Sequence, residues 1–549
     1  MRRCLPLLVL VIGSCAAAPQ TTDPGGPQTF LVRAGEDPQN AVNKARPGDT
    51  ILLENGVTYA GNLFLGPKEG DGWIDIRPVN TDFLPPGDQR VTPEHAAQMP
   101  KLLSNNTDPA LGTVRAAHHY RITGIEIGVV PGRWNWNIVN IGSGQEKTVE
   151  EFPHTIVFDR VYVHGDAENG SVRGFALNGR NLEVRNSHIA DFKRPNLDTQ
   201  AIAVWNSPGQ IRILNNRLEG AAENIIIGGS TPSILNMVPS DIEIRRNHFV
   251  KPLSWRESDP SFAGTAWSVK NLFEIKMGRK VTLDSNVLEY AWQHHQIGFA
   301  IVLTVRTENA AVPESVIEDI QITNNIIRHA GCGINILGTD DWQKGAGLGK
   351  TRRVTVRNNL FYDIGGHWGC GGRMFQMLNG AEEIEIDHNT IVRRGGSIFV
   401  ADGMPHRGLR MTNNIISYGS YGVVGEGIPN GDRVLAHYFP GAEIRKNVLI
   451  DVQPNLRPPD NFFLRSYDDL PFFDGGNLDF RLDESSKFRG AATDGSDVGA
   501  NIQALLDSVA GVIAGVPADR VPPDQRFLSP PRTPEAIKAA RKNKNRSSK

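Results

Sequence analysis

The sequence predicts an all-β solenoid, and three observations in its 549 residues predict it. A short stretch recurs, best seen from Ile242 to Phe249, in which apolar and polar residues alternate like a strand before an Asn turn. The turn asparagines lie 25 to 39 positions apart by subtraction, which is typical of one supersecondary unit stacked many times. The intervening sequence holds β-branched runs and Gly-rich turns instead of periodic helical segments. The turn residues are Asn216, Asn247, Asn286, Asn325, Asn359, Asn389, Asn414 and Asn447.

The units are those of a parallel β-helix. Neither the consensus of leucine-rich repeats nor the Trp-Asp signature of propellers is present. In a β-helix, inward side chains stack on their equivalents in the coils above and below. A buried Asn can then pass its amide hydrogen bonds along the stack and satisfy groups that would otherwise be costly. We therefore predict that the turn asparagines are structural.

The first 26 residues predict export. Two arginines follow Met1, and a short apolar core from Leu5 to Ile12 is too short to span a bilayer. Ile12 to Cys15 resembles a bacterial lipobox, in which Cys15 would carry lipid. Cleavage after Ala18 is the alternative, although Pro19 would then follow the cut. We expect an exported lipoprotein at the cell envelope, or a secreted or periplasmic protein, that meets a membrane only through Cys15.

The body begins with a short helix. Asp37 is a suitable N-cap, Pro38 suits the first helical position, and Pro47-Gly48 would stop the helix. We expect this helix to close the first coil. The helix, the following strand and an Asn-Gly turn resemble the opening of secreted right-handed parallel β-helix proteins. The resemblance implies a right-handed parallel β-helix over 27–505. From the composition of the chain beyond it we expect 506–549 to be a cap segment and a disordered basic tail, with Ile502 to Ile513 as an amphipathic cap helix.

Composition and net charge limit the classes of molecule that this protein is expected to bind. A net charge of −2, 57 Gly and a 39% hydrophobic fraction suit a turn-rich soluble protein with no bias toward nucleic acid. We expect a monomer. Beyond the leader, Cys332 and Cys370 fall in neighbouring repeats, and the sequence leaves open whether they form a disulfide.

Chemistry on such a solenoid must use outward residues and loops. The two-residue period of a strand turns Glu274 and Lys276 outward if their neighbours are core. The same counting predicts an outward strip of Glu223, Glu274, Lys276 and Arg306, continued by Asn335 and Gln376. Loops beside it carry residues that could bind sugar: Trp205, Trp255, Trp267, Trp292, Arg194, Arg256, His294 and His295.

Two reactions and one non-catalytic function fit this strip. A polysaccharide lyase needs a base, for which Lys270, Lys276, His294 and His295 are candidates, and a cation to neutralise the uronate, for which Arg256 and Arg306 are candidates. A glycoside hydrolase needs two carboxylates, which Asp198, Glu223 and Glu274 could supply. A non-catalytic carbohydrate-binding or structural solenoid is the third alternative.

Two resemblances bear on function. Leu218 to Ser230 is similar to the calcium-site strand of alginate and chondroitin lyases of this fold, but Ile225 and Ser230 replace an acid and a lysine there, so only Glu223 carries over as a metal ligand, with Ca²⁺ as the implied cofactor. The chain also resembles secreted bacterial β-helix proteins of unassigned activity at Asp198 to Ala203, Asn271 to Lys276 and Gly333 to Gly338. These resemblances imply a carbohydrate-active protein on an acidic polysaccharide, with elimination somewhat ahead of hydrolysis.

Overall fold

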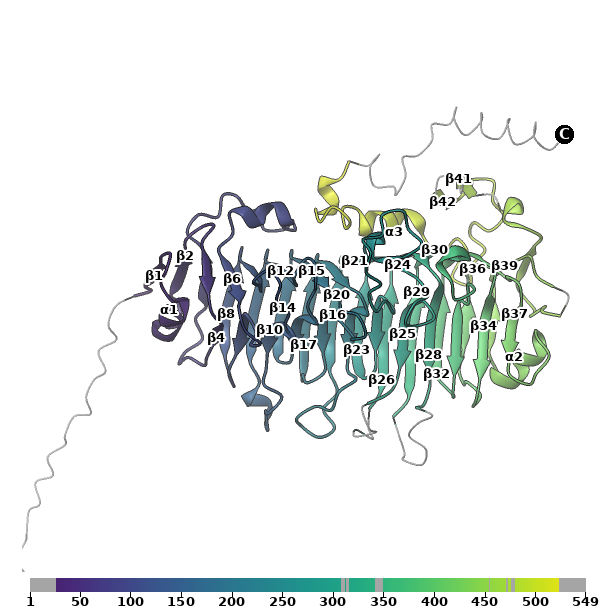
Figure 1. Ribbon diagram of the computed structural model, residues 1–549. Helices are drawn as coiled ribbons and strands as arrows, with labels where there is room; N and C mark the ends of the chain where they lie inside the picture. The colour runs from purple at the N-terminus through teal and green to yellow at the C-terminus, as the bar shows by residue number, and fades with distance from the viewer. Residues whose placement is uncertain are drawn as a thin grey trace, which may run out of the picture.

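The chain winds through three long parallel sheets (Figure 1). The computed structural model describes residues 26–307, 312, 315–340, 349–453, 455–470, 472–474 and 479–522. The predicted signal segment, Cys15 and the basic tail from 523 lie outside the described residues. Successive strands pass from sheet A to sheet B to sheet C and back to sheet A, so each circuit is one coil. The prediction of a parallel β-helix is confirmed.

Each sheet is built by stacking equivalent strands of successive coils in parallel register. Sheet A contains β1 (Thr29–Val32), β2 (Thr50–Leu53), β5 (Ile74–Pro78), β8 (His118–Thr123), β11 (His154–Asp159), β14 (Arg180–Arg185), β17 (Gly209–Leu214), β20 (Ser240–Arg245), β23 (Gly278–Asp284), β26 (Ile317–Thr323), β29 (Thr351–Arg357), β32 (Glu382–Asp387), β35 (Arg410–Thr412) and β38 (Glu443–Arg445). Sheet B contains β3 (Thr58–Ala60), β6 (Lys101–Ser104), β9 (Glu126–Val129), β12 (Tyr162–His164), β15 (His188–Phe192), β18 (Arg217–Gly220), β21 (His248–Val250), β24 (Val287–Ala291), β27 (Ile326–Ala330), β30 (Leu360–Gly365), β33 (Thr390–Arg394), β36 (Ile415–Ser417), β39 (Val448–Ile450) and β40 (Phe462–Leu464). Sheet C contains β4 (Leu63–Leu65), β7 (Leu111–Thr113), β10 (Asn137–Ile141), β13 (Arg173–Leu177), β16 (Gln200–Val204), β19 (Glu223–Ile227), β22 (Phe273–Ile275), β25 (Phe299–Thr304), β28 (Cys332–Leu337), β31 (Phe375–Leu378), β34 (Ser397–Asp402) and β37 (Gly422–Gly425).

The predicted asparagine stack lies inside the turn between sheets A and B. All eight predicted side chains are fully buried. In each coil the Asn backbone N–H and side-chain amide both donate to the Oδ1 of the next Asn, as Asn325 does to Asn359 at 2.9 and 3.0 Å. The residue before each Asn has a positive φ, such as 56° at Asn324, which bends the chain sharply out of sheet A. The stack continues one step further than predicted, to Asn461.

Inward apolar side chains from all three sheets form one core cluster that runs from Val32 to Leu456. Helix α1 (Pro38–Lys44) forms where the sequence predicts a helix, because Asp37 accepts a hydrogen bond from the Gln39 N–H and Pro38 starts the helix. Helix α2 (Asp432–Tyr438) packs on β37 at the opposite end of the solenoid from α1 (Figure 1).

The chain after sheet B's last strand folds back along the outside of the solenoid. It includes the antiparallel pair β41 (Phe472–Asp474) and β42 (Asp479–Leu482) and helix α3 (Ile502–Val509). Apolar residues of α3 pack on the outer face of sheet B against Val287, Ile326 and Leu360. The sequence predicted a cap helix from Ile502 to Ile513. The helix is shorter and lies along the side of the solenoid, because outward apolar residues on several consecutive strands offer it a larger surface there.

This returning segment (493–520) is held by the positive-φ residues that precede the asparagine stack. Asn413, Asn358 and Arg246 bond in turn to Thr493, Asn501 and the carbonyl of Ala510. The buried Arg90 donates to the carbonyl of Val512 at 2.9 Å. The segment therefore runs antiparallel to the order of the coils, from the C-terminal half of the solenoid back toward the N-terminal half.

Cys332 and Cys370 are joined by a disulfide, with their Cα atoms 5.6 Å apart. The sequence left this pairing open. Short 3-10 turns are η1 (Pro93–Ala97), η2 (Val149–Glu151), η3 (Leu253–Trp255), η5 (Gly366–Trp368), η6 (Tyr467–Asp469) and η8 (Ala518–Arg520). Among the described residues, no helix has the length and apolar character needed to cross a membrane.

Candidate functional site

The outer face of sheet C carries two parallel rows of side chains. The register brings the second row together across consecutive strands: Asn140, Ala176, Ala203, Ile226, Glu274, Val302, Asn335 and Gln376. The first row lies three residues earlier in the chain, in each strand or, for Asn271 and Arg373, just before it: Asn137, Arg173, Gln200, Glu223, Asn271, Phe299, Cys332 and Arg373. Neighbouring members of a row sit on adjacent strands, about 4.8 Å apart.

Hydrogen bonds tie the polar members of these rows together. In the first row, Arg173 Nε donates to Gln200 Oε1 at 2.9 Å, and Gln200 Nε2 donates to Glu223 Oε2 at 2.7 Å. Between the rows, Asn271 Nδ2 donates to Glu274 Oε2 at 2.8 Å. The side chains of Arg173, Gln200 and Glu223 on β13, β16 and β19 are therefore fixed relative to one another before any ligand arrives, and Asn271 and Glu274 form a second fixed pair.

Glu223 lies at the floor of this network and is only 1% exposed. Its pKa is raised above the usual value, first because burial disfavours the charged carboxylate and second because Glu274 is a nearby like charge. Lys270 opposes this effect, with its Nζ 3.9 Å from Glu223 Oε1. Lys270 also pairs with Asp198 at 2.5 Å. Burial lowers the pKa of Lys270, but the three carboxylates around it outweigh burial, so its pKa is raised and it stays a cation.

Lys251 lies beneath Glu223 and is fully buried. Its Nζ donates to the carbonyls of Gly220, Ala221 and Ala222 at 2.6, 3.0 and 3.3 Å and to Asn224 Oδ1 at 3.2 Å. These carbonyls form the tight turn from β18 into β19, so the ammonium group fixes the turn that presents Glu223. Burial lowers the pKa of Lys251. Sequence reasoning missed this lysine. The one signal for it is a charged residue directly after an apolar strand.

Glu274 forms the second acidic centre and is also buried. Lys276 Nζ lies 3.6 Å from its Oε1, and Lys276 is partly exposed. The structure thus brings together five residues that the sequence offered as candidates: Asp198, Glu223, Lys270, Glu274 and Lys276. Both acids lie beneath the two partly exposed lysines.

The other predicted members of the strip are separated from this centre or already engaged. Arg306 makes a forked ion pair with the buried carboxylate of Asp340, with contacts of 2.9 to 3.2 Å, so its guanidinium is committed to the protein. Asn335 and Gln376 bond to each other at 2.9 Å. They lie beyond Val302, which belongs to an apolar cluster with Phe299 and the disulfide. The apolar cluster therefore interrupts the predicted strip. Counting along one strand could not show this, because it does not reveal which side chains lie on the neighbouring strands.

The tryptophans in the loops mostly pack inward. Trp255, Trp267 and Trp292 are buried in one cluster with Trp368, so of the two functions open to them, packing and sugar stacking, these three serve packing. The ammonium group of Lys193 lies 5.6 and 5.3 Å from the rings of Trp255 and Trp267, which holds the long loop 251–272 against the solenoid. Trp205 remains partly exposed, with the Arg173 guanidinium 5.4 Å from its ring centre.

The loop residues proposed for lyase chemistry have competing contacts. Arg256 lies over the Trp368 ring at 4.4 Å and donates to the carbonyl of His367. His294 and His295 are exposed. The backbone N–H of Val269 approaches His294 Nδ1 at 3.4 Å, and burial lowers the pKa of His294. A neutral ring that accepts at Nδ1 carries its proton on Nε2, so it offers a donor rather than a base.

The residues around Glu223 do not fit a calcium ion. Calcium takes six to eight oxygen ligands. Here Lys270 lies close to both carboxylates that could bind the ion, Glu223 and Asp198, and Gln200 occupies the other Glu223 oxygen. Within the described ranges, no cluster of three or more His, Cys, Asp or Glu side chains is arranged to hold a metal.

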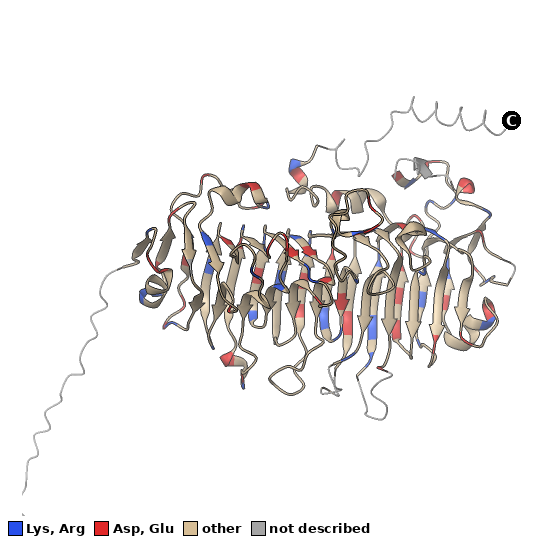
Figure 2. Cartoon of the chain, in the orientation of Figure 1, with Lys and Arg blue, Asp and Glu red and all other residues tan. Residues whose placement is uncertain are grey.

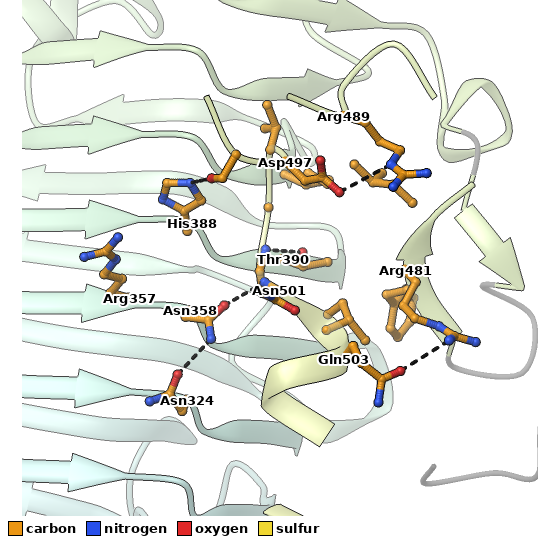
Figure 3. A pocket seen from close by; sticks show the side chains of 18 of the residues that line it. Asn324, Arg357, Asn358, His388, Thr390, Arg481, Arg489, Asp497, Asn501 and Gln503 are labelled. Atoms are coloured by element: carbon orange, nitrogen blue, oxygen red, sulfur yellow. Dashed lines mark hydrogen bonds and ion pairs between the residues drawn. The ribbon is translucent and has the colours of Figure 1, made fainter. Parts of the chain in front are cut away.

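A separate groove lies between the returning segment and the turns from sheet A to sheet B (Figure 3). Its volume is about 950 Å³, and its wall includes Asn324, Asn358 and His388. Most of its labelled polar groups bond to one another, as Asn358 does to the backbone of Asn501 at 2.7 Å and His388 to Ser496 at 2.9 Å. We read it as the seam where the returning segment docks.

Basic and acidic residues are interspersed along the strands (Figure 2).

No family model matches the chain, and no curated protein matches it in sequence. Among solved structures, an alginate lyase from Paenibacillus sp. matches at 14% identity over 73% of this chain and 97% of that chain, with a TM-score of 0.30. A mannuronic-acid-specific polysaccharide family 6 lyase from human gut microbiota matches at 14% identity over 79% of this chain and 91% of that chain, with a TM-score of 0.42. A surface adhesin of Streptococcus pneumoniae matches at 9% identity over 78% and 86%, with a TM-score of 0.40. At these values the likenesses carry no argument about this chain, and its fold rests on its own strand pairing.

Proposed function

We propose that this protein is a carbohydrate-active solenoid that binds an acidic polysaccharide along the outer face of sheet C. The observation that carries the proposal is the hydrogen-bonded row from Arg173 through Gln200 to Glu223, flanked by Lys270 and Lys276. The row crosses adjacent strands, so it presents polar groups at intervals close to the length of a sugar residue.

An acidic ligand suits this surface better than an uncharged one. The glutamates lie underneath, and the partly exposed ends of Lys270 and Lys276 meet solvent over them, beside the exposed carboxylate of Asp198 that pairs with Lys270. Uronate carboxylates would accept charge-assisted hydrogen bonds from both ammonium groups. Binding should therefore weaken as ionic strength rises.

Cleavage of the bound chain is the second candidate function, and the Glu223–Glu274 pair favours it. The raised pKa of Glu223 keeps a proton on that carboxyl near neutral pH. The carboxyl of Glu274 lies nearby, with Lys276 Nζ 3.6 Å from its Oε1 and Asn271 Nδ2 donating to its Oε2 at 2.8 Å. An acid beside a carboxylate suits glycoside hydrolysis. Elimination has weaker support, because Lys270 stays a cation and Arg306 is engaged with Asp340. In either reaction the lysines must move aside, since both glutamates are buried.

The test is a binding and product assay with the purified protein. Alginate, pectate and glycosaminoglycans are titrated by calorimetry against an uncharged glucan. Substituting Lys270→Gln and Lys276→Gln should each weaken acidic-polymer binding about tenfold, because each loses one charge-assisted contact. Lys280→Gln is the matched control, since Lys280 is an exposed lysine on sheet A. Equal affinity in all variants would reject the site.

The products decide between the reactions. Ultraviolet absorbance from unsaturated uronate ends indicates elimination, and new reducing ends without that absorbance indicate hydrolysis. Hydrolysis that persists unchanged in both Glu223→Gln and Glu274→Gln would exclude the carboxyl pair. Binding without either product leaves the non-catalytic function.

The same proposal includes the finer features of the chain. We place the winding as right-handed, in line with the strong preference of parallel crossovers, and α1 as a cap on the first coil, since Ala41 and Val42 join the core. We propose export with lipid on Cys15 and a monomeric state. The disulfide supports an oxidising compartment. Mass spectrometry of the mature N-terminus tests the lipid, because an unmodified residue after Ala18 would exclude it.

A further inference from the structure

A pair of tryptophans lies at the N-terminal end of the first row. Trp136 directly precedes Asn137, the first member of that row, and 52% of Trp136 is exposed. Its ring centre lies 5.7 Å from that of Trp134, in an edge-to-face arrangement at 69°. The Arg194 guanidinium lies 4.6 Å from the Trp134 ring. The half-exposed indole of Trp136 offers a flat apolar face with a polar N–H at its edge, which suits stacking on a sugar ring.

The backbone fixes this pair. Asn135 stands between the two tryptophans and is buried, and its Nδ2 donates to the carbonyl of Asp108 at 2.6 Å and to Ser104 Oγ at 3.2 Å. The carbonyl of Trp136 accepts from the N–H of Arg173 at 3.0 Å, which places Trp136 beside the first polar residue of β13. The two rings are therefore held outward before a ligand binds, which lowers the entropic cost of stacking on them.

We propose that Trp136, supported by Trp134 and Arg194, is a stacking subsite for a pyranose ring of the same acidic polysaccharide. This inference rests on the proposed function and adds the direction and minimum length of the ligand. Strands β10, β13, β16, β19 and β22 are consecutive in sheet C, and Trp136 and Lys270 each directly precede a member of the first row, Asn137 and Asn271. Four steps of about 4.8 Å, or about 19 Å in all, therefore separate their positions. The polysaccharide chain runs along the solenoid axis and covers about four sugar residues between the tryptophan pair and the lysines.

The geometry makes a prediction about ligand length. A uronate hexamer reaches both Trp136 and Lys270, whereas a dimer reaches only one of them. A hexamer should therefore bind less tightly to Trp136→Ala and to Lys270→Gln, about tenfold in each case, which corresponds to about 1.4 kcal/mol. A dimer should respond to only one of the two substitutions. The hexamer should also change the tryptophan fluorescence of the wild type more than that of Trp136→Ala.

Calorimetry with hexamers and dimers prepared from the best-binding polymer tests this, after circular dichroism confirms that each variant is folded. Trp136→Phe should recover much of the affinity, because it keeps a ring at that position. Tyr421→Ala is the matched control, since Tyr421 is a 60% exposed aromatic residue near β37. Hexamer affinity unchanged in Trp136→Ala but reduced in Lys270→Gln would overturn the subsite and leave the proposed function standing. Absence of binding by the wild type to every acidic polymer would instead reject the proposed function.

Discussion

Substituting Asn325→Ala should destabilise the solenoid by about 3 to 5 kcal/mol. Asn325 is fully buried in the stack. Its Oδ1 accepts from the N–H and the Nδ2 of Asn286 at 2.9 and 3.0 Å, and its own Nδ2 donates to the carbonyl of Leu283 at 2.8 Å. Truncation removes these three bonds and the bond from Asn325 Nδ2 to Asn359 Oδ1 at 3.0 Å, and it leaves the buried N–H of Asn286 without its acceptor. Each buried donor left unsatisfied costs about 1 to 3 kcal/mol, and the small cavity adds to that loss.

The assay is urea denaturation followed by circular dichroism, with the free energy of unfolding compared between variants. The control is Asn461→Ala, at the end of the same stack. Asn461 accepts two bonds from Asn447 at 2.9 Å, but it is partly exposed, so water can replace them. We expect a loss of about 1 kcal/mol or less there. If both variants lost the same small amount, the stacked amides would not stabilise the turn, and the physical reason given for the repeat would be wrong.

Four further predictions concern the disulfide, pH and the returning segment. Cys370→Ser should lower the free energy of unfolding by about 3 to 4 kcal/mol, because the cross-link to Cys332 closes a long loop, and a denaturation midpoint equal to that of the wild type would contradict this. Burial lowers the pKa of the fully buried His406 to about 4, so its contribution to stability is present above pH 6.5 and is lost as pH falls toward 4. Between pH 7 and pH 5 the free energy of unfolding of the wild type should therefore fall by about 2 kcal/mol more than that of His406→Asn. Parallel pH profiles of the two proteins would argue against this. The raised pKa of Glu223 makes stability depend on pH in the opposite direction. Its contribution to stability is present below the pKa of the unfolded state and is lost as pH rises through the pKa of the folded state. The melting temperature of Glu223→Gln should therefore increase relative to that of the wild type as pH rises from 6 to 9. Arg246→Ala removes donors to the carbonyls of the returning segment, and limited proteolysis should then cut within 493–520 faster while the coils stay intact; unchanged cleavage would show that the segment is held mainly by its apolar contacts.

Several features of the candidate site could not be predicted from sequence. Glu223, Glu274 and Lys276 come together as predicted because the two-residue period of a strand and the stacking of coils are both regular. Arg306 does not join them, because Asp340 in the next coil pairs with it, and such a partner is invisible to counting along one strand. Lys251 was not expected either. Its ammonium group is buried because adjacent carbonyls of one turn accept hydrogen bonds from it, and that turn lies about 30 positions earlier in the chain.

The loops show the same limit. The sequence left open whether the tryptophans of loop 251–272 face a ligand or pack in the protein, and they pack on one another and on Lys193. Loop conformation depends on contacts with other coils, so local composition does not determine which side of an aromatic ring is buried. Trp136 was not selected from sequence at all. Its exposure follows from the burial of its neighbour Asn135.

The sequence by itself determined the parallel β-helix and the asparagine stack. Both depend on patterns that repeat within each coil, and every coil satisfies its backbone against an equivalent neighbour, so local rules suffice. Only the tertiary structure decided the disulfide, the buried lysine beneath Glu223 and the course of the returning segment. Arg90, for example, bonds to a carbonyl 422 positions away. Such contacts join residues that no periodicity relates, and they form only because the completed solenoid offers a surface on which they can pack.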